Sequence, residues 1–209
     1  MKYRRFPLGG LWTNGYLFYD GDGDAFFVDP GGDVSEVLDF MKEQKLTLKA
    51  VLLTHGHLDH IAGIGEMIPL VKDAIYISPE DAPLLKRPPE SMQAALGMEC
   101  AGASAFRTAA EGDALKIGAY TIDVMETPGH TQGSMCYLIR QGEDKILISG
   151  DTLFAQSVGR TDLPGGDSAM LDMSLEKLAA LPDDLVVLPG HGPETTIGRE
   201  RKSNPFWPR

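Results

Sequence analysis

The segment THGHLDH, residues 54–60, constrains this chain more than any other. It places three imidazoles and one carboxylate within six positions, directly after a short apolar run. Such a run ending in a Thr-His-Gly turn predicts a buried strand that stops at the rim of a sheet. Beyond that rim, we expect His55 and His57, two positions apart, to point to one side of an extended segment. Asp59 and His60 open the next element and can reach a second point in space, which suits two metal ions better than one.

The two remaining histidines follow the same layout. The chain has five His, and His130 and His191 each lie in a Gly-containing turn, in the sequences TPGHT and PGHG. His191 comes just after the apolar run 185–188, and Asp151 closes the strand predicted over 145–148 in the same way. A single His is more often structural, and a single Asp after a strand is more often a turn former or helix cap. The whole set is different, because catalytic metal sites need imidazoles and carboxylates that converge from several strand ends.

Length and charge limit the class of protein. At 209 residues the chain can bury a substantial core, and no linker or change of composition marks a second domain. A single domain over residues 1–209 is therefore predicted. The net charge of −11 would repel nucleic-acid backbones and anionic membranes, so we expect neither as a partner. An anionic substrate would need a local basic patch.

Cysteine usage and the first residues bear on location. Cys100 and Cys136 have no metal-binding spacing, and Cys136 lies in an apolar run, which favours a packing role. Residues 1–10 are basic but lack the apolar core of a signal peptide, and no stretch approaches the length of a membrane span. We expect a cytoplasmic protein. Its oligomeric state is open.

Strand and helix signals alternate before the His-rich segment. The runs 14–19 and 25–28 flank an acidic Asp-Gly turn and predict a hairpin. A calcium loop is the alternative for this turn, but the spacing lacks the Glu at its twelfth position. A helix over about 35–45 follows, with Asp33 or Ser35 as its cap. This βα rhythm predicts an α/β fold.

The later elements are predicted from the same signals. They are a helix over 61–68, strands over 74–78, 115–117, 120–125, 135–140 and 145–148, a Gly-rich loop over 155–167, a helix over 168–181 and a strand over 185–188. Segment 79–105 combines Pro and Met residues and predicts short helices, which either pack against an edge or form a mobile lid. The tail 199–209 is the one basic cluster, either solvated or in contact with substrate carboxylates or a second subunit.

These motifs resemble the metallo-β-lactamase fold superfamily, whose signature is His-x-His-x-Asp-His, a later Gly-His, an Asp after a strand and a late Gly-His. Within it, TPGHTQGS at 127–134 and GDTLF at 150–154 are similar to glyoxalase II, the hydroxyacylglutathione hydrolases, particularly the short bacterial type. The resemblance covers nearly the whole chain. It implies an αββα sandwich of two mixed β-sheets with flanking helices and the metals at one edge, without a C-terminal helical glutathione-binding domain.

The resemblance also implies a role for each residue of the set. The implied ligands are His55, His57 and His130 for one ion, Asp59, His60 and His191 for the other, and Asp151 between the two. Asp59 and Asp151 are in addition the predicted catalytic residues. Asp29 has the place of a carboxylate that orients a ligand imidazole from behind. Two divalent ions are expected, zinc first, with iron or manganese as alternatives.

The activity implied is hydrolysis of a small-molecule thioester, S-lactoylglutathione or a similar hydroxyacyl thioester, by a metal-bound hydroxide. Arg160 matches a basic substrate-binding position of glyoxalase II and is the predicted substrate contact. Asp162 and Pro193 stand where that family has tyrosines, so the contacts to glutathione differ. The basic residues within 199–202 are candidates to bind the substrate in place of those contacts.

Two other functions stay open. The segment 159–162 also resembles the persulfide dioxygenases of this superfamily, which use a single iron on two histidines and an aspartate, here His55, His130 and Asp151. The other is a further hydrolase of the fold, such as a lactonase, β-lactamase or nuclease, and the acidic charge counts against a nuclease. A non-catalytic binding module is disfavoured because the complete ligand set is present.

Overall fold

Successive residues of the central strands face different apolar layers. In β3 (Asp24–Val28), Ala25 and Phe27 pack toward the helices, whereas Phe26 and Val28 pack toward the second sheet. Residues two apart share a face of a strand, so a strand with both faces buried must be apolar throughout. This is why the sequence shows continuous apolar runs here rather than an apolar-polar alternation.

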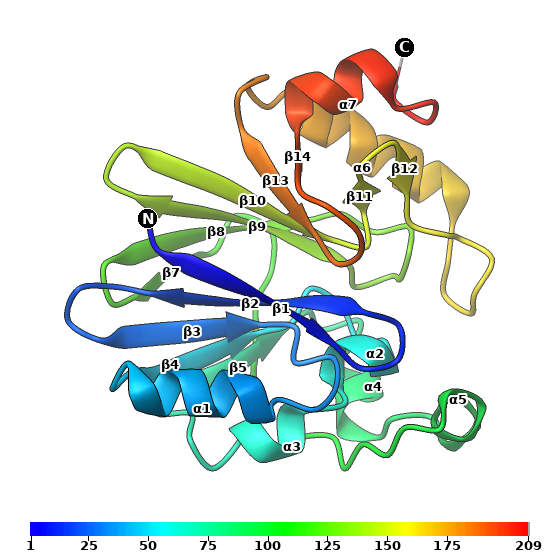
Figure 1. Cartoon of the computed structure of the whole chain (residues 1–209). Helices are drawn as coiled ribbons and strands as arrows, with labels where there is room; N and C mark the ends of the chain where they lie inside the picture. Colours follow the sequence, from blue (N-terminus) through cyan, green and yellow to red (C-terminus); the bar gives the residue numbers. More distant parts are fainter. Residues whose placement is uncertain (209) are drawn as a thin grey trace.

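The computed structural model describes residues 1–208, in which two six-stranded sheets pack face to face (Figure 1). The first contains, in spatial order, β1 (Tyr3–Leu8), β2 (Thr13–Tyr19), β3, β4 (Thr47–Leu52), β5 (Ala74–Ile77) and β6 (Arg107–Thr108). Its first three strands are antiparallel and the rest run parallel to β3. This sheet is therefore mixed.

The second sheet is also mixed. Its order is β14 (Thr195–Thr196), β13 (Val186–Pro189), β10 (Asp144–Gly150), β9 (Met135–Gln141), β8 (Tyr120–Glu126) and β7 (Ala114–Ile117). Only the neighbours β10 and β13 are parallel. A separate hairpin is formed by β11 (Leu153–Phe154) and β12 (Ser157–Val158).

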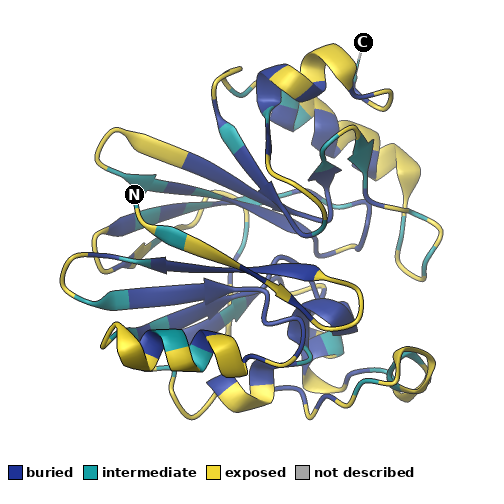
Figure 2. Ribbon diagram, viewed as in Figure 1, coloured by how far each residue is buried: buried dark blue, intermediate teal, exposed yellow. Residues whose placement is uncertain are grey.

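Helices cover the outer face of each sheet. Beside the first sheet lie α1 (Ser35–Glu43), α2 (Leu58–Ile61), α3 (Ile64–Met67) and α4 (Ala82–Lys86), whereas α5 (Glu90–Leu96) projects away from the sheet. Beside the second lie α6 (Ser168–Ala179) and α7 (Ile197–Ser203). Figure 2 shows buried strands between half-exposed helices, with α5 almost wholly exposed. The predicted αββα sandwich of two mixed sheets with flanking helices is confirmed.

Polar groups link the two sheets across their apolar interface. The buried hydroxyls of Tyr16 and Tyr137 donate to the carbonyls of Pro189 and Leu53, each at 2.8 Å. At the opposite end of the strands, the buried carboxylate of Asp20 accepts from Ala119 N in the β7–β8 turn at 2.9 Å. These bonds fix the relative position of the sheets.

The helix predicted over 61–68 is wrong. The chain forms two separate turns of helix, α2 and α3, with Gly63 between them. Gly63 N donates to Pro30 O at 2.8 Å, and a Cβ at this position would collide with Gly32 O. This close approach to the loop after β3 interrupts the helix and has no counterpart in the local pattern of apolar residues.

Several short elements escaped the prediction. The edge strand β1 lies in the basic N-terminal segment, and the loop predicted over 155–167 contains β12. Cys136 is buried beside the layer under α6, and Cys100 is buried near α2, as expected for packing. Within residues 1–208, every helix is too short or too polar to cross a membrane.

Candidate metal centre

The predicted site residues meet where strands of both sheets end. The parallel neighbours β3 and β4 end next to each other and present Asp29 and the 54–60 loop. The parallel neighbours β10 and β13 do the same in the second sheet with Asp151 and His191. Asn14 N donates to Gly190 O across the interface at 2.7 Å, which brings the two edges together.

All seven predicted ligands belong to one cluster. Within it, three groups of residues have donor atoms within 4.8 Å of one another: His55 with His57 and His130, His55 with His60 and Asp151, and Asp59 with His60 and His191. The first and third groups match the two predicted sets. His191 is the most exposed member, and the other six residues are buried.

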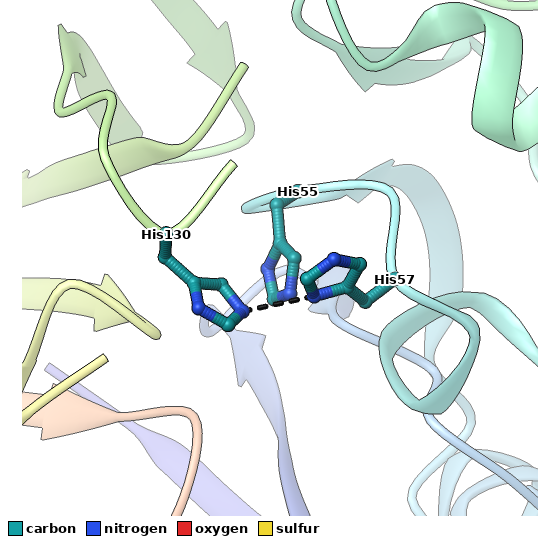
Figure 3. Close-up of side chains that lie close together, drawn as sticks. All are labelled: His55, His57 and His130. Carbon is teal, nitrogen blue, oxygen red and sulfur yellow. Dashed lines mark hydrogen bonds between the residues drawn. The ribbon is translucent and has the colours of Figure 1, made fainter. Parts of the chain in front are cut away.

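The first group contains only imidazoles (Figure 3). His55 and His57 come from the loop after β4, and His130 comes from the loop between β8 and β9. Nδ1 of His57 lies 2.9 Å from Nε2 of His130, and the His55 ring lies edge-on to both. Three nitrogens that converge in this way form one face of a metal site.

Asp151 lies between the two predicted sets. Its Oδ1 is 3.3 Å from Nε2 of His60, and its Oδ2 is 3.6 Å from Nε2 of His130 and 3.5 Å from Nε2 of His191. The remaining carboxylate, Asp59, has its Oδ2 3.3 Å from Nε2 of His191. Asp151 therefore lies close to imidazoles of both predicted sets, and its Oδ2 alone approaches one imidazole of each set.

Hydrogen bonds from behind orient four of the five rings. Nδ1 of His130 contacts Arg160 O at 2.7 Å, and Nδ1 of His191 contacts Leu11 O at 3.2 Å. A carbonyl oxygen only accepts, so each Nδ1 carries the hydrogen and each Nε2 is left for the cluster. Nδ1 of His55 lies 3.1 Å from the Thr54 hydroxyl, and His60 binds Asp29 in the same way.

Asp29 lies where the sequence predicts a supporting carboxylate. Its Oδ2 is 2.9 Å from His60 Nδ1 and accepts from Thr54 Oγ1 at 2.7 Å, while its Oδ1 accepts from Thr54 N at 2.8 Å. It has a left-handed backbone, with φ 53°, a conformation that Asp tolerates better than most residues. The carboxylate thus connects the end of β3 to the His-rich loop.

The cluster favours neutral imidazoles on one side and positive charge on the other. Burial lowers the pKa of His55 well below its ordinary value and that of His57 to about 4, which leaves both neutral, the form that binds metals. Burial opposes a charge on His191 as well, but Asp151 and Asp59 outweigh it and raise its pKa to about 9. Carboxylates that stabilise a cation here are suited to a metal ion.

His60 and the carboxylates behave in the same sense. Burial opposes the charged form of His60, but Asp151, Asp29 and Asp59 raise its pKa well above the ordinary value. Burial would raise the pKa of Asp59, yet His60 and His191 lower it to about 2. Asp151 is likewise held well below its usual range against its own burial. Both carboxylates are therefore ionised at neutral pH.

Unpartnered buried atoms test whether the cluster fits a metal. Among residues 1–208, the buried side-chain polar atoms without a hydrogen-bond partner include His55 Nε2, His60 Nε2 and Asp151 Oδ1. Buried polar atoms are rarely left unpaired, because each costs about 1–3 kcal/mol. Imidazole nitrogens and carboxylate oxygens without a thiolate suit zinc, iron or manganese. The residues fit divalent metal ions.

Sequence reasoning missed Asp81, a buried residue between β5 and α4. Its Oδ2 accepts from Gly56 N and from Thr131 Oγ1, both at 2.8 Å, and its Oδ1 accepts from Gly133 N at 3.1 Å. Gly56 lies between two predicted ligands and Thr131 follows a third. One carboxylate thus holds both loops of the first group. Its only sequence signal is an Asp shortly after a strand, which by itself indicates a turn.

Two polar residues at the start of β2 were also missed. Thr13 Oγ1 donates to Asp59 Oδ2 at 3.2 Å. Asn14 Nδ2 donates to the carbonyls of Pro189 and Gly192, both at 2.9 Å, on either side of His191. Both side chains are buried. Thr13 therefore orients Asp59 from the same sheet, whereas Asn14 holds the loop around His191 from the opposite sheet.

A cavity of about 600 Å³ opens beside the cluster. Met92, Ala95 and Leu96 of α5 line it, so part of segment 79–105 forms a wall of the site, while α4 packs against the core. Arg160 lines it too, but its guanidinium binds both oxygens of Asp162 at 2.7 Å. The described part of the basic tail, 199–208, does not line this cavity, and its Arg201 pairs with Asp183 at 2.8 Å.

Sequence comparisons identify relatives that match almost the whole chain. A family model described as the metallo-beta-lactamase superfamily matches residues 9–191. An uncharacterized protein of Mycobacterium leprae is 42% identical over 96% of both chains. A hydroxyacylglutathione hydrolase of Haemophilus influenzae, GloC, is 35% identical over 99% of this chain and 98% of its own.

Solved structures show the same fold. The B3 metallo-beta-lactamase BLEG-1 superposes with a TM-score of 0.89 at 37% identity, covering 98% of this chain and 99% of its own. TTHA1623, solved in a di-iron-bound form, has a TM-score of 0.86 at 34% identity, covering 97% and 99%. ETHE1 from Myxococcus xanthus has a TM-score of 0.79 at 30% identity, covering 98% and 84%.

Proposed function

The chain belongs to the metallo-beta-lactamase superfamily, and we propose that this metallo-hydrolase cleaves thioesters, with S-lactoylglutathione or a similar hydroxyacyl thioester as substrate. The likeness to the hydroxyacylglutathione hydrolase of H. influenzae over almost the whole of both chains supports this choice. A small-molecule substrate also agrees with a cavity of about 600 Å³, the size that takes compact organic ligands.

The position of Asp151 carries the proposal. Its Oδ1 lies 3.3 Å from Nε2 of His60, and its Oδ2 lies 3.6 Å from Nε2 of His130 and 3.5 Å from Nε2 of His191, so it approaches both sets. We propose that this residue bridges two ions. The ligands would be His55, His57 and His130 for one ion and Asp59, His60 and His191 for the other.

The chemistry follows from the donor set. Two divalent ions, when bound, supply an ionised water at neutral pH and polarise the scissile carbonyl. The protein positions the donors: Leu11 O and Arg160 O hold two imidazoles with Nε2 toward the cluster, and Thr13 orients Asp59. A thiolate leaves readily, so a strong general acid is not required. Arg160 is the proposed substrate contact at the rim.

The test is steady-state hydrolysis of S-lactoylglutathione by protein reconstituted separately with zinc, manganese or iron. We expect turnover that is lost in His57→Ala, because this change removes one nitrogen of the first group. Met173→Ala, on the exposed side of α6, is the matched control and should retain turnover. Absence of thioester turnover with every metal would contradict the proposal.

A persulfide dioxygenase is the second candidate, since ETHE1 from M. xanthus is 30% identical over 98% of this chain. This reaction would use one iron on His55, His130 and Asp151. Oxygen uptake by the iron-loaded protein with glutathione persulfide would favour it, especially with no thioester turnover. Because the chain is also similar to the B3 metallo-beta-lactamase BLEG-1, hydrolysis of a β-lactam should be measured alongside these two reactions.

A further inference from the structure

We propose that the acyl group of the natural substrate is longer and more apolar than lactoyl, and that the cavity beside the cluster selects it. This inference rests on the proposed thioesterase activity. Seven apolar side chains line the cavity: Leu11, Met92, Ala95, Leu96, Phe154, Val158 and Leu163. A lactoyl group has three carbons and would leave most of this apolar surface uncovered.

The apolar wall is assembled from separate parts of the chain. Leu11 comes from the β1–β2 loop, Leu96 from α5 and Phe154 from the β11–β12 hairpin. Leu11 and Leu96 are 48% and 36% exposed. Single exposed apolar side chains are ordinary, but apolar side chains that surround a cavity with a few polar groups are typical of a binding site.

The apolar side chains reach the reacting end of the cavity. The ring of Phe154 lies edge-on to that of His191, with 6.0 Å between centroids, and the Leu11 carbonyl contacts the same imidazole. A thioester carbonyl that reacts at the cluster has the acyl chain on one side and the thiol sulfur on the other. Of these two groups the apolar wall suits the acyl chain, because glutathione is charged and polar.

The hairpin that contributes Phe154 and Val158 is anchored from behind. The buried carboxylate of Glu200 in α7 accepts from Gln156 N at 2.7 Å. Asn204 Nδ2 donates to Ser157 O at 3.0 Å. Because these bonds already fix the hairpin, it loses little conformational freedom when a ligand binds. Less of the free energy of the apolar contacts is then spent on ordering the protein.

Charged contacts in the cavity discriminate less between substrates than its apolar contacts do. Glutathione has two carboxylates, and besides imidazoles the cavity has one basic side chain, Arg160. Its guanidinium also pairs with Asp162 through two bonds of 2.7 Å, which offsets part of its positive charge. Burial of apolar acyl surface is therefore the main source of selectivity.

The experiment uses S-(2-hydroxyacyl)glutathiones with unbranched acyl chains of three to six carbons. All share one thiol, so only the acyl group varies. We expect kcat/KM of the metal-loaded protein to rise about two- to fourfold for each added methylene. The lower value corresponds to partial burial of the methylene and the upper value to full burial. Binding of the free 2-hydroxy acids, measured by calorimetry, should strengthen along the same series.

Variants of the cavity wall test whether it causes the rise of kcat/KM with acyl length. Leu96→Ser and Phe154→Ala should each reduce the rise per methylene, whereas Met173→Ala, an exposed apolar residue outside the cavity lining, should not. Leu96 is on the surface of α5, so its replacement leaves the core intact. A flat or falling series with lactoylglutathione still hydrolysed would overturn this inference and leave the thioesterase proposal standing. A rise that survives both variants would also overturn it, and no thioester turnover at all would refute both.

Discussion

The Oδ2 atom of Asp29 lies 2.9 Å from Nδ1 of His60. Asp29 follows β3, His60 belongs to α2, and the parallel pairing of β3 with β4 brings the two together. The same carboxylate binds the backbone and hydroxyl of Thr54. It therefore orients one imidazole of the second group and also fixes the loop that carries the first.

Asp29→Asn tests this relationship without straining the backbone, because Asn also tolerates the φ of 53°. The amide loses the negative charge and one acceptor for His60 and Thr54. We expect metal affinity to fall about 10- to 100-fold, as for other partners of ligand imidazoles. Competition with a chelator measures it. Asp33→Asn, an exposed change in the same loop, is the control, and equal affinities in the two variants would contradict the role of Asp29.

Asp81→Asn should loosen the loops on both sides of the first group. Oδ2 accepts from Gly56 N and Thr131 Oγ1, and an amide nitrogen in its place accepts from neither. The expected cost is about 1–3 kcal/mol of unfolding free energy, together with weaker metal binding. Thermal unfolding and the absorption spectrum of the cobalt-substituted protein report the two effects. Glu80→Gln, a neighbouring exposed change, should alter neither, and an unchanged cobalt spectrum in Asp81→Asn would refute the positioning role.

Asp20 should make stability depend on pH in the acid range. Burial would raise the pKa of its carboxyl, but backbone N–H groups of Ala119, Asp24 and Asp22 outweigh burial and lower it from 3.8. A carboxyl with a lowered folded-state pKa contributes stability above its unfolded-state pKa and loses it as the pH falls through the folded-state value. The difference in unfolding free energy between wild type and Asp20→Asn should therefore be constant from pH 5 to pH 7 and shrink toward pH 2. Urea unfolding measures it, with exposed Asp22→Asn as control; a difference independent of pH would exclude this contribution.

Metal removal should destabilise the fold as well as abolish activity. Among residues 1–208, His55 Nε2, His60 Nε2 and Asp151 Oδ1 are buried without a hydrogen-bond partner, and a bound cation would be a partner for the nitrogens and the oxygen alike. Metal at 100 times its Kd should stabilise the protein by about 2.7 kcal/mol, if the unfolded chain does not bind it. Thermal unfolding before and after chelation, and after metal is restored, gives the shift. In His57→Ala the shift should be markedly smaller, and an equal shift in both proteins would place the metal elsewhere.

Much of the fold was predictable because the central strands are buried on both faces. The run before His55 and the run before His191 are continuous and apolar, and each corresponds to a strand, β4 and β13. The break at Gly63 was not predictable, because it depends on contact with the loop after β3, about 30 positions away along the chain. Short edge elements such as β1 bury only part of their side chains and have a weak pattern.

The sequence by itself determined which donor atoms this protein can offer a metal. Imidazoles and carboxylates that directly follow apolar runs lie at strand ends, and this relation is local in the chain. Only the tertiary structure decided how they are supported: Asp81 joins loops some 25 and 50 positions away, and Thr13 reaches Asp59 from another strand. It likewise decided that Arg160 binds Asp162 and that α5 lines the cavity. Such contacts depend on the packing of distant segments, which leaves no periodic pattern in the sequence.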